Sequence, residues 1–230
     1  MKRTAVMLAV LVMFPAIVFG QQSFKDNFED LDAWEVISGD WHVEDNALIG
    51  YWPLSDAYGV QGNIVLKNSV FKASSWVAEY EFTYSDGYAQ ADGMSFIDTE
   101  NYVRVGIGYG HSGWDGALAD SIMWYIGGEK NGSSEGVFHG YKWAYIHWDP
   151  KEWNKVRLEK RGNQYKLYFN GTFIGADVDT SLNGAGQFGF HVYGPCKIRN
   201  LSIMELDEGG SVELAGQWSG MKCRAVEVSG

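Results

Sequence analysis

The sequence is poor in cysteine, in positive charge and in long apolar runs, and each shortage excludes a class of protein. Two Cys in 230 residues cannot support a small disulfide-dense fold. Lys and Arg number 18 against 29 Asp and Glu, for a net charge of −11, which disfavours nucleic acid and anionic membrane surfaces as partners. Beyond residue 20 we find neither a second long apolar stretch nor a sustained 3.6-residue period, which argues against a helical bundle.

Aromatic residues and glycine are abundant instead. The chain holds 10 Trp, 13 Tyr, 12 Phe and 29 Gly, and 46% of its residues are hydrophobic. This composition excludes an intrinsically disordered chain, which is poor in aromatic and apolar residues. It is typical of a globular β protein, with glycine in the turns and aromatic side chains on the strand faces.

The first 20 residues have the pattern of a secretory signal peptide. Lys2 and Arg3 precede an apolar run over Ala5–Val18, and Gly20 supplies a small residue for cleavage. An uncleaved membrane anchor is the alternative, although the run is short for a bilayer span. We therefore expect a secreted protein, extracellular or periplasmic and without membrane insertion after cleavage, whose single domain spans 21–206 before a weakly patterned tail over 207–230.

Alternating strands predict an all-β, antiparallel, two-sheet sandwich. The segment Trp76–Tyr84 places aromatic residues and Ala78 on one face and Glu79 and Glu81 on the other. The clearest hairpin spans Gln164–Ala176 around Asn170-Gly171, a dipeptide suited to a type I′ turn. The last core strands are predicted over Gln187–Tyr193 and Lys197–Leu206.

Three stretches resemble the concanavalin A-like lectin/glucanase superfamily, and more narrowly its laminin-G-like and 3-keto-disaccharide-hydrolase-like domains. They are Asp26–Tyr51, with its Gly-x-Trp-x-Val pattern, Trp153–Gly175 with the Asn-Gly hairpin, and Gly186–Leu206 with Arg199-Asn200. The resemblance implies a jelly-roll sandwich with a concave sheet that faces a saccharide. It leaves open whether the saccharide is cleaved.

The carboxylate pattern of the glucanases in this superfamily is incomplete here. Those enzymes carry Glu-x-Asp-x-(x)-Glu on a concave strand, whereas this chain has Glu79 and Glu81 followed by Thr83. Where the 3-keto-disaccharide hydrolases often show Gln-Asp-His-Gly, this chain has His191-Val192-Tyr193-Gly194. Both departures favour binding over catalysis, with Glu79, Glu81 and His191 as the catalytic candidates of the alternative.

Two groups of residues are candidate ligand contacts. Glu79, Glu81, Arg104 and His191 fall on the outward parity of predicted strands and would converge if those strands were neighbours; ordinary solvent-facing residues are the alternative. The loop-rich segment between 98 and 149 is crowded with aromatic residues that suit stacking on sugar rings, although several are expected in the core. The candidates from this segment and its surroundings are Tyr109, His111, Trp114, Asp115, Trp124, Tyr125, His139, Tyr141, Trp143, Tyr145, Trp148 and Tyr193.

Two further features concern stability rather than ligand contact. Asp26, Glu29 and Asp207 would form a structural Ca²⁺ site if the first and last strands pair, and a solvated acidic edge is the alternative. No cofactor is otherwise required. Cys196 and Cys223 are predicted to form a disulfide in the exported chain, with two free thiols as the alternative.

The sequence therefore predicts a secreted, non-catalytic β-sandwich that binds a neutral oligo- or polysaccharide. A glycoside hydrolase that uses Glu79 and Glu81, or one of them with His191, is the second hypothesis. A structural or protein-interaction module of the cell envelope is the third.

Overall fold

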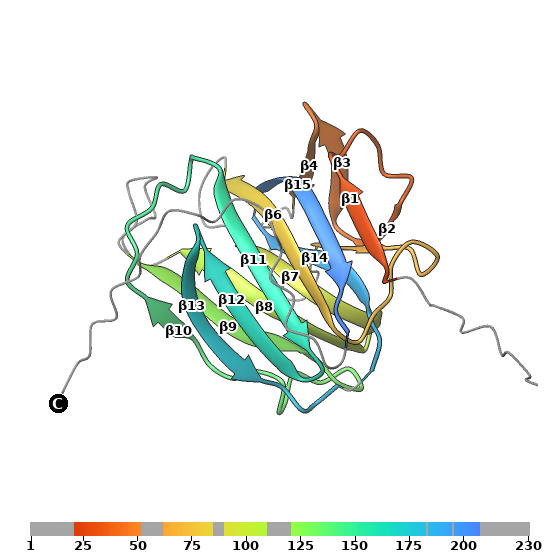
Figure 1. Ribbon diagram of the computed structural model, residues 1–230, viewed down its shortest axis with the longest axis vertical. Helices are drawn as coiled ribbons and strands as arrows, with labels where there is room; N and C mark the ends of the chain where they lie inside the picture. Colours follow the sequence, from red (N-terminus) through yellow and green to blue (C-terminus); the bar gives the residue numbers. More distant parts are fainter. Residues whose placement is uncertain are drawn as a thin grey trace, which may run out of the picture.

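The computed structural model describes residues 21–51, 62–84, 90–109, 121–182, 184–194 and 196–207, and these ranges contain strands and turns but no helix. The strands form two antiparallel sheets packed face to face (Figure 1). The predicted all-β sandwich is thereby confirmed. No helix in the described ranges is long and apolar enough to cross a membrane.

The first sheet has eight strands. Its main path is β13 (Thr172–Val178), β12 (Gln164–Phe169), β11 (Asn154–Arg161), β6 (Trp76–Tyr84), β15 (Cys196–Glu205), β4 (Ala47–Tyr51) and β3 (Asp40–Glu44), and β1 (Ser23–Asp26) pairs with β15 beside that path. Neighbours in this order are often distant in sequence, as expected for a jelly roll.

The second sheet has seven strands. In order across the sheet they are β10 (Lys142–Ala144), β9 (Ile122–Glu129), β8 (Asn101–Tyr109), β7 (Gln90–Asp98), β14 (Gln187–Tyr193), β5 (Gly62–Leu66) and β2 (Trp34–Ser38). In Figure 1 this sheet lies behind the strands β6, β11 and β12 of the first sheet.

Aromatic side chains from both sheets fill the space between them. On β6 the alternation predicted from sequence holds, since Trp76, Tyr80 and Phe82 are fully buried. Across the interface, Tyr80 meets Phe190 edge-on with ring centroids 4.9 Å apart, and Trp76 meets Phe188 at 5.2 Å. Edge-to-face pairs of this kind contribute roughly 0.5–1.5 kcal/mol beyond the area they bury. These interlocking rings fix the position of one sheet relative to the other.

The predicted hairpin between β12 and β13 is confirmed. Asn170 and Gly171 both have positive φ, 45° and 81°, as a type I′ turn requires. Asn170 also joins this turn to β11, because its amide donates to the carbonyl of Lys155 and its Oδ1 accepts from the amide of Lys155, each at 2.8 Å.

The register of the seven-stranded sheet decides which side chains share its outer face. His191 lies opposite both Asn63 on β5 and Asp92 on β7, while Arg104 on β8 lies opposite Met94. Facing residues in antiparallel strands project to the same side, and Phe188 and Phe190 on β14 point into the core. His191, Asp92 and Arg104 therefore project away from the core.

Candidate functional site

The four side chains predicted to converge are divided between the two sheets. Glu79 and Glu81 belong to β6 of the eight-stranded sheet, whereas Arg104 and His191 belong to β8 and β14 of the seven-stranded sheet. Each residue does point away from the core, as its parity predicted. However, the outer faces of the two sheets are on opposite sides of the sandwich, so the predicted cluster of four is wrong.

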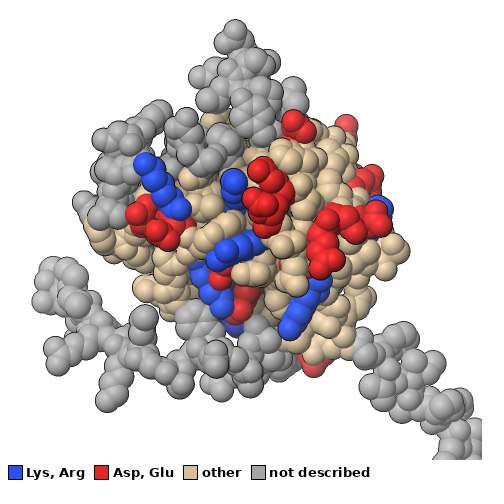
Figure 2. Space-filling view, turned by 90° about the horizontal axis from the view of Figure 1, so that it is seen from above, with Lys and Arg blue, Asp and Glu red and all other residues tan. Residues whose placement is uncertain are grey.

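On the eight-stranded sheet, the two glutamates are occupied by neighbouring cations. Glu79 accepts from Nη1 of Arg157 at 2.9 Å, with Nζ of Lys155 at 3.4 Å. Glu81 accepts from Nε of Arg199 at 2.7 Å. Acidic and basic side chains are also interspersed over the face of the molecule drawn in Figure 2. These bonds satisfy the carboxylates locally, which is the arrangement of a stable charged surface rather than of a reacting pair.

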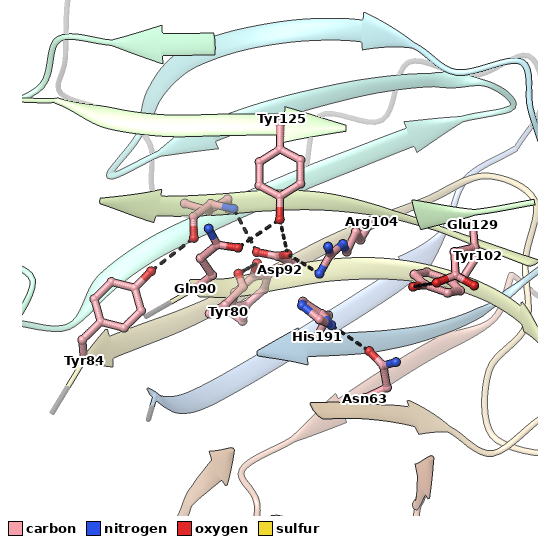
Figure 3. Close-up of polar contacts among 12 residues, drawn as sticks. Asn63, Tyr80, Tyr84, Gln90, Asp92, Tyr102, Arg104, Tyr125, Glu129 and His191 are labelled. Atoms are coloured by element: carbon pink, nitrogen blue, oxygen red, sulfur yellow. Dashed lines mark hydrogen bonds and ion pairs between the residues drawn. The ribbon is translucent and has the colours of Figure 1, made fainter. Parts of the chain in front are cut away.

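On the seven-stranded sheet, four polar side chains lie in a line, and we call Asn63, His191, Asp92 and Tyr125 the polar row (Figure 3). They belong to β5, β14, β7 and β9, with Gly106 of β8 between the last two strands. His191 Nδ1 lies 2.9 Å from Oδ1 of Asn63. The hydroxyl of Tyr125 lies 3.2 Å from Oδ2 of Asp92 and 2.9 Å from Oε1 of Gln90, the next polar side chain along β7. All five side chains are buried although they lie on the outer side of the sheet.

Asp92 is the central acid of the polar row. It is fully buried, and its Oδ1 accepts from the amide of Ile107 at 3.0 Å. Burial raises the pKa of Asp92 to about 7, even though Arg104, the Ile107 amide and the Tyr125 hydroxyl all favour the ionised form. Asp92 therefore exchanges its proton near neutral pH, which ordinary surface carboxylates do not.

Arg104 lies beside Asp92 and has too few partners. Its Nη1 is 3.5 Å from Oδ2 of Asp92, beyond good hydrogen-bond distance, and its guanidinium is 5.7 Å from the ring centroid of Tyr125. Nε and Nη1 are both buried and have no hydrogen-bond partner. Buried polar groups in native proteins are almost always hydrogen-bonded, so the unpaired donors of Arg104 are available to an acceptor that binds from outside.

His191 is an uncharged member of the polar row. Burial lowers the pKa of His191 well below its usual value, and the neighbouring Arg104 lowers it further. The imidazole is therefore neutral at physiological pH. Its contact with Asn63 fixes the ring orientation, so His191 offers a positioned hydrogen-bonding group without charge.

A short stretch of the chain carries four exposed aromatic side chains, which we call the aromatic edge: Phe138, Tyr141, Trp143 and Tyr145. All four are large exposed hydrophobic residues, with 44% to 89% of each accessible. Tyr141 and Phe138 meet the ring of Tyr125 edge-on at centroid distances of 5.4 and 5.8 Å. Trp143 on β10 lies opposite Met123, so it shares the outer face with Tyr125. A flat ligand on this face would meet both rings and polar groups.

The other predicted aromatic contacts have different positions. Trp124 and Trp148 are core residues with 4% and 3% of their surface exposed, so their assignment to the ligand is wrong. Tyr193 is half-buried on the outer face, opposite Gln90. His139 lies 3.1 Å from Asp177 and joins the segment before β10 to β13. His111, Trp114, Asp115 and the side chain of Tyr109 lie outside the described residues.

The sequence interpretation missed Asp92, Gln90 and Asn63. Asp92 lies in Gln90–Asp98, where Ala91, Gly93 and Ser95 face the other sheet. Small inward residues hide the usual apolar alternation, so the acid could have been found only by treating Met94 and Phe96 as outward-facing. Nothing in the sequence indicated that these two large apolar side chains face outward.

The predicted calcium ligands are not brought together. The first and last strands do pair, but Asp26 lies opposite Leu201 and Ser23 opposite Met204, so Asp207 is at the other end of β15. Asp26 instead accepts from the amide of Phe28 and from Nε1 of Trp34. Within the described ranges no three His, Cys, Asp or Glu side chains form a group that would hold a metal ion.

Cys196 is a buried free thiol in the structure. Cys223 lies outside the described residues, so the disulfide between them stays a prediction. Burial raises the pKa of the Cys196 thiol, which therefore stays protonated and unreactive.

Comparison with known proteins gives a match in structure but not in sequence. The sequence matches no protein-family model and no curated protein. The carbohydrate-binding module CBM66 from Bacillus subtilis has a TM-score of 0.55 at 18% identity, over 74% of this chain and 94% of that chain. A β-glucanase of Bacillus licheniformis has a TM-score of 0.56 at 10% identity, over 81% and 99%. A kappa-carrageenase from Zobellia galactanivorans has a TM-score of 0.54 at 9% identity, over 82% and 96%.

At these identities the likeness is one of fold. The chain has the concanavalin A-like jelly-roll fold, as its resemblance to that superfamily predicted. The same fold occurs in a binding module and in glycan-cleaving enzymes, so the fold alone does not decide between the two activities.

Proposed function

We propose that this chain is an exported carbohydrate-binding protein that holds a saccharide on the outer face of its seven-stranded sheet. The observation that carries the proposal is Arg104, a buried cation with two unpaired N–H groups beside the polar row. Sugar hydroxyls and carboxylates are acceptors that such a guanidinium binds in pairs. The aromatic edge supplies ring faces for the C–H side of a sugar.

Among the residues that the structure describes, the placement of the carboxylates favours binding over hydrolysis. Glycoside hydrolases of the common type need two carboxyl groups roughly 5 to 10 Å apart across the scissile bond. Asp92 is the one carboxylate of the polar row, and Glu129 nearby accepts from the hydroxyl of Tyr102 at 3.3 Å. Glu79 and Glu81 are on the opposite side of the sandwich and are paired with Arg157, Lys155 and Arg199.

One observation nevertheless supports a hydrolase as the second candidate. A buried carboxyl whose pKa is about 7, as in Asp92, is protonated often enough at neutral pH to act as a general acid. In that case Asp92→Asn would abolish release of reducing ends from the glycan that binds. If Asp92→Asn and the unchanged protein both leave the bound glycan intact, the hydrolase candidate is excluded for that glycan.

Export rests on residues 1–20, which lie outside the described ranges. We expect the mature chain to begin at Gln21, and intact-mass measurement of protein from the culture medium or periplasm tests this. A mass that retains the first 20 residues would favour the membrane anchor.

The test of binding is a glycan array probed with the folded mature chain. We expect a small set of related glycans to bind and Arg104→Gln to lose them. The matched control is Arg199→Gln on the opposite sheet, where the arginine is already paired with Glu81. Absence of any glycan hit with folded protein would refute the proposal, and equal loss in the two variants would place binding elsewhere.

A further inference from the structure

The surroundings of Arg104 leave its charge poorly balanced. Five ionisable side chains of the described residues lie near it: Asp92, His191, Tyr102, Tyr125 and Tyr141. His191 is neutral, and Tyr102 keeps its proton at physiological pH, since burial raises its pKa to about 12. Asp92 is thus the one group there that offers Arg104 a negative charge.

Asp92 is a weak counter-ion because its oxygens are used elsewhere. Oδ1 accepts from the Ile107 amide, and Oδ2 lies 3.2 Å from the Tyr125 hydroxyl. Tyr125 has one hydroxyl proton but two oxygen neighbours, and the shorter contact, at 2.9 Å, is to Gln90. The single proton of Tyr125 can be donated to Asp92 or to Gln90 but not fully to both, so the hydrogen bond that Asp92 receives from it is weak. Burial raises the pKa of Asp92 to about 7, so Asp92 is only partly ionised beside a charged Arg104 at neutral pH.

The guanidinium of Arg104 combines unpaired donors with partial access to solvent. Nε and Nη1 are buried and have no hydrogen-bond partner. The Arg104 side chain as a whole is 15% exposed. An acceptor that arrives from solvent can therefore reach the guanidinium and bind two of its nitrogens at the same time.

We propose that Arg104 binds the carboxylate of an acidic sugar residue, an inference that rests on the proposed saccharide-binding function. A carboxylate presents two acceptor oxygens to the open guanidinium and supplies the missing negative charge. A neutral sugar offers hydroxyls that accept from the same nitrogens but leave the buried charge uncompensated. The negative net charge of the chain opposes an acidic ligand only at long range, where salt screens it.

The two ligand classes predict opposite pH dependence at Asp92. A bound carboxylate repels ionised Asp92, so acidic saccharides bind more tightly below about pH 7, where Asp92 is protonated. A neutral saccharide would gain an acceptor when Asp92 ionises, so it would bind more tightly above about pH 7. The described groups that act on Asp92 or lie opposite it are Arg104, His191, Tyr125, Tyr80 and Cys196. Arg104 is the cation among them, His191 is neutral, and burial raises the pKa of Tyr80 and of Cys196.

The test is calorimetric titration of the mature chain with galacturonic acid oligosaccharides and with galactose oligosaccharides of the same length. We expect the acidic series to bind about tenfold more tightly at about pH 5.5 than at about pH 8.5, with proton uptake near pH 7.5. Asp92→Asn should flatten this pH dependence, because asparagine resembles the protonated acid. Glu81→Gln on the opposite sheet should leave it unchanged.

The possible outcomes distinguish failure of the carboxylate assignment from failure of saccharide binding itself. Galactose oligosaccharides that bind as tightly as the acidic series, or affinity that rises with pH, would overturn the carboxylate assignment and leave saccharide binding intact. Acetate that binds as tightly as the acidic oligosaccharide would also overturn it, since the sugar would then contribute nothing. If no glycan of either kind binds folded protein, in these titrations or on an array, both proposals fail.

Discussion

The outer faces of the two sheets carry similar residue types in very different states. On the eight-stranded sheet, Glu79, Glu81 and Arg157 are partly exposed and each has a partner of opposite charge within hydrogen-bond distance. On the seven-stranded sheet, Oδ2 of Asp92 lies 3.5 Å from Nη1 of Arg104. Nε and Nη1 of Arg104 have no hydrogen-bond partner. The charged groups named on the eight-stranded sheet have hydrogen-bonded partners of opposite charge, whereas Arg104 on the seven-stranded sheet does not.

This difference separates a surface that stabilises the fold from one suited to a ligand. Exposed ion pairs satisfy themselves in water and contribute little, so nothing is gained when a ligand displaces them. A buried, unsatisfied arginine costs stability until an acceptor arrives, and natural proteins retain such groups where function requires them. From the sequence, the charged residues of the two faces look equivalent. Their hydrogen-bond partners in the structure show which face has unpaired donors.

The largest expected effect comes from removing the unsatisfied cation. Arg104→Met should weaken glycan binding by about 100-fold, because charge-assisted hydrogen bonds to the ligand are lost. Its free energy of unfolding should stay the same or rise, since a buried cation without full pairing is replaced by an apolar side chain. Glycan titration and urea denaturation measure the two quantities.

The matched change on the other face is Arg157→Met. Here we expect affinity to stay within about twofold and stability to fall by about 1 kcal/mol, because Glu79 and Glu159 lose their shared partner. If the two variants behaved alike in both measurements, the distinction between the faces would be lost.

A methyl group at Gly106 should disturb the polar row from below. A Cβ at this position would lie 2.1 Å from Cε1 of Tyr125, whose ring covers the glycine. We expect Gly106→Ala to lower the free energy of unfolding by roughly 1–3 kcal/mol, the usual cost of overpacking. In Tyr125→Leu the ring is absent, so adding Gly106→Ala to it should cost clearly less. Equal costs in both backgrounds would show that Tyr125 does not lie over Gly106.

Asp92 should make stability depend on pH. Its folded pKa of about 7 lies above the ordinary carboxyl value of 3.8, so the folded chain holds a proton that the unfolded chain releases between those values. The free energy of unfolding should therefore fall as pH rises from about 4 to 7, by at most about 1.4 kcal/mol per pH unit. Asp92→Asn should remove this contribution in urea denaturation at several pH values. Identical slopes in the variant and the unchanged protein would contradict the raised pKa.

The smallest predicted effect belongs to the aromatic edge. Tyr141→Ala should weaken glycan binding by roughly 3- to 10-fold, since one stacking face is lost. The matched control is Phe173→Ala on β13, an equally exposed ring that contacts Tyr168 on the eight-stranded sheet. That control should leave affinity unchanged. A larger loss from Phe173→Ala than from Tyr141→Ala would move the stacking surface to the other sheet.

Much of the fold could be predicted from alternation. The strands β6, β12, β14 and β15 and the Asn170-Gly171 turn follow directly from local sequence, because period-two patterns and turn chemistry are local properties. Alternation also placed Arg104 and His191 on the outward side of their strands. It could not tell which sheet each strand joins, since both sheets of a sandwich have an outward side.

The polar row was harder to predict for a packing reason. On β7 the inward residues are small, and a Cβ at Gly93 would lie 2.7 Å from Cδ2 of Leu158 on the opposite sheet. Close approach of the sheets selects small residues there, so the apolar signal on β7 comes from the outward Met94. Trp124 and Trp148 were misassigned for a related reason, because a loop-rich stretch of sequence still contributes rings to the core.

The most direct test of the central claim is to map the binding surface by NMR chemical-shift perturbation with the best glycan from an array. We predict that the perturbed amides belong to β7, β8, β9 and β14, with the Arg104 and Tyr125 side chains among the most affected. Amides of β6, β11 and β15 around Glu79, Glu81 and Arg199 should stay unshifted. Perturbations concentrated on β6, β11 and β15 would contradict the account, because the ligand would then occupy the face whose charges are already paired.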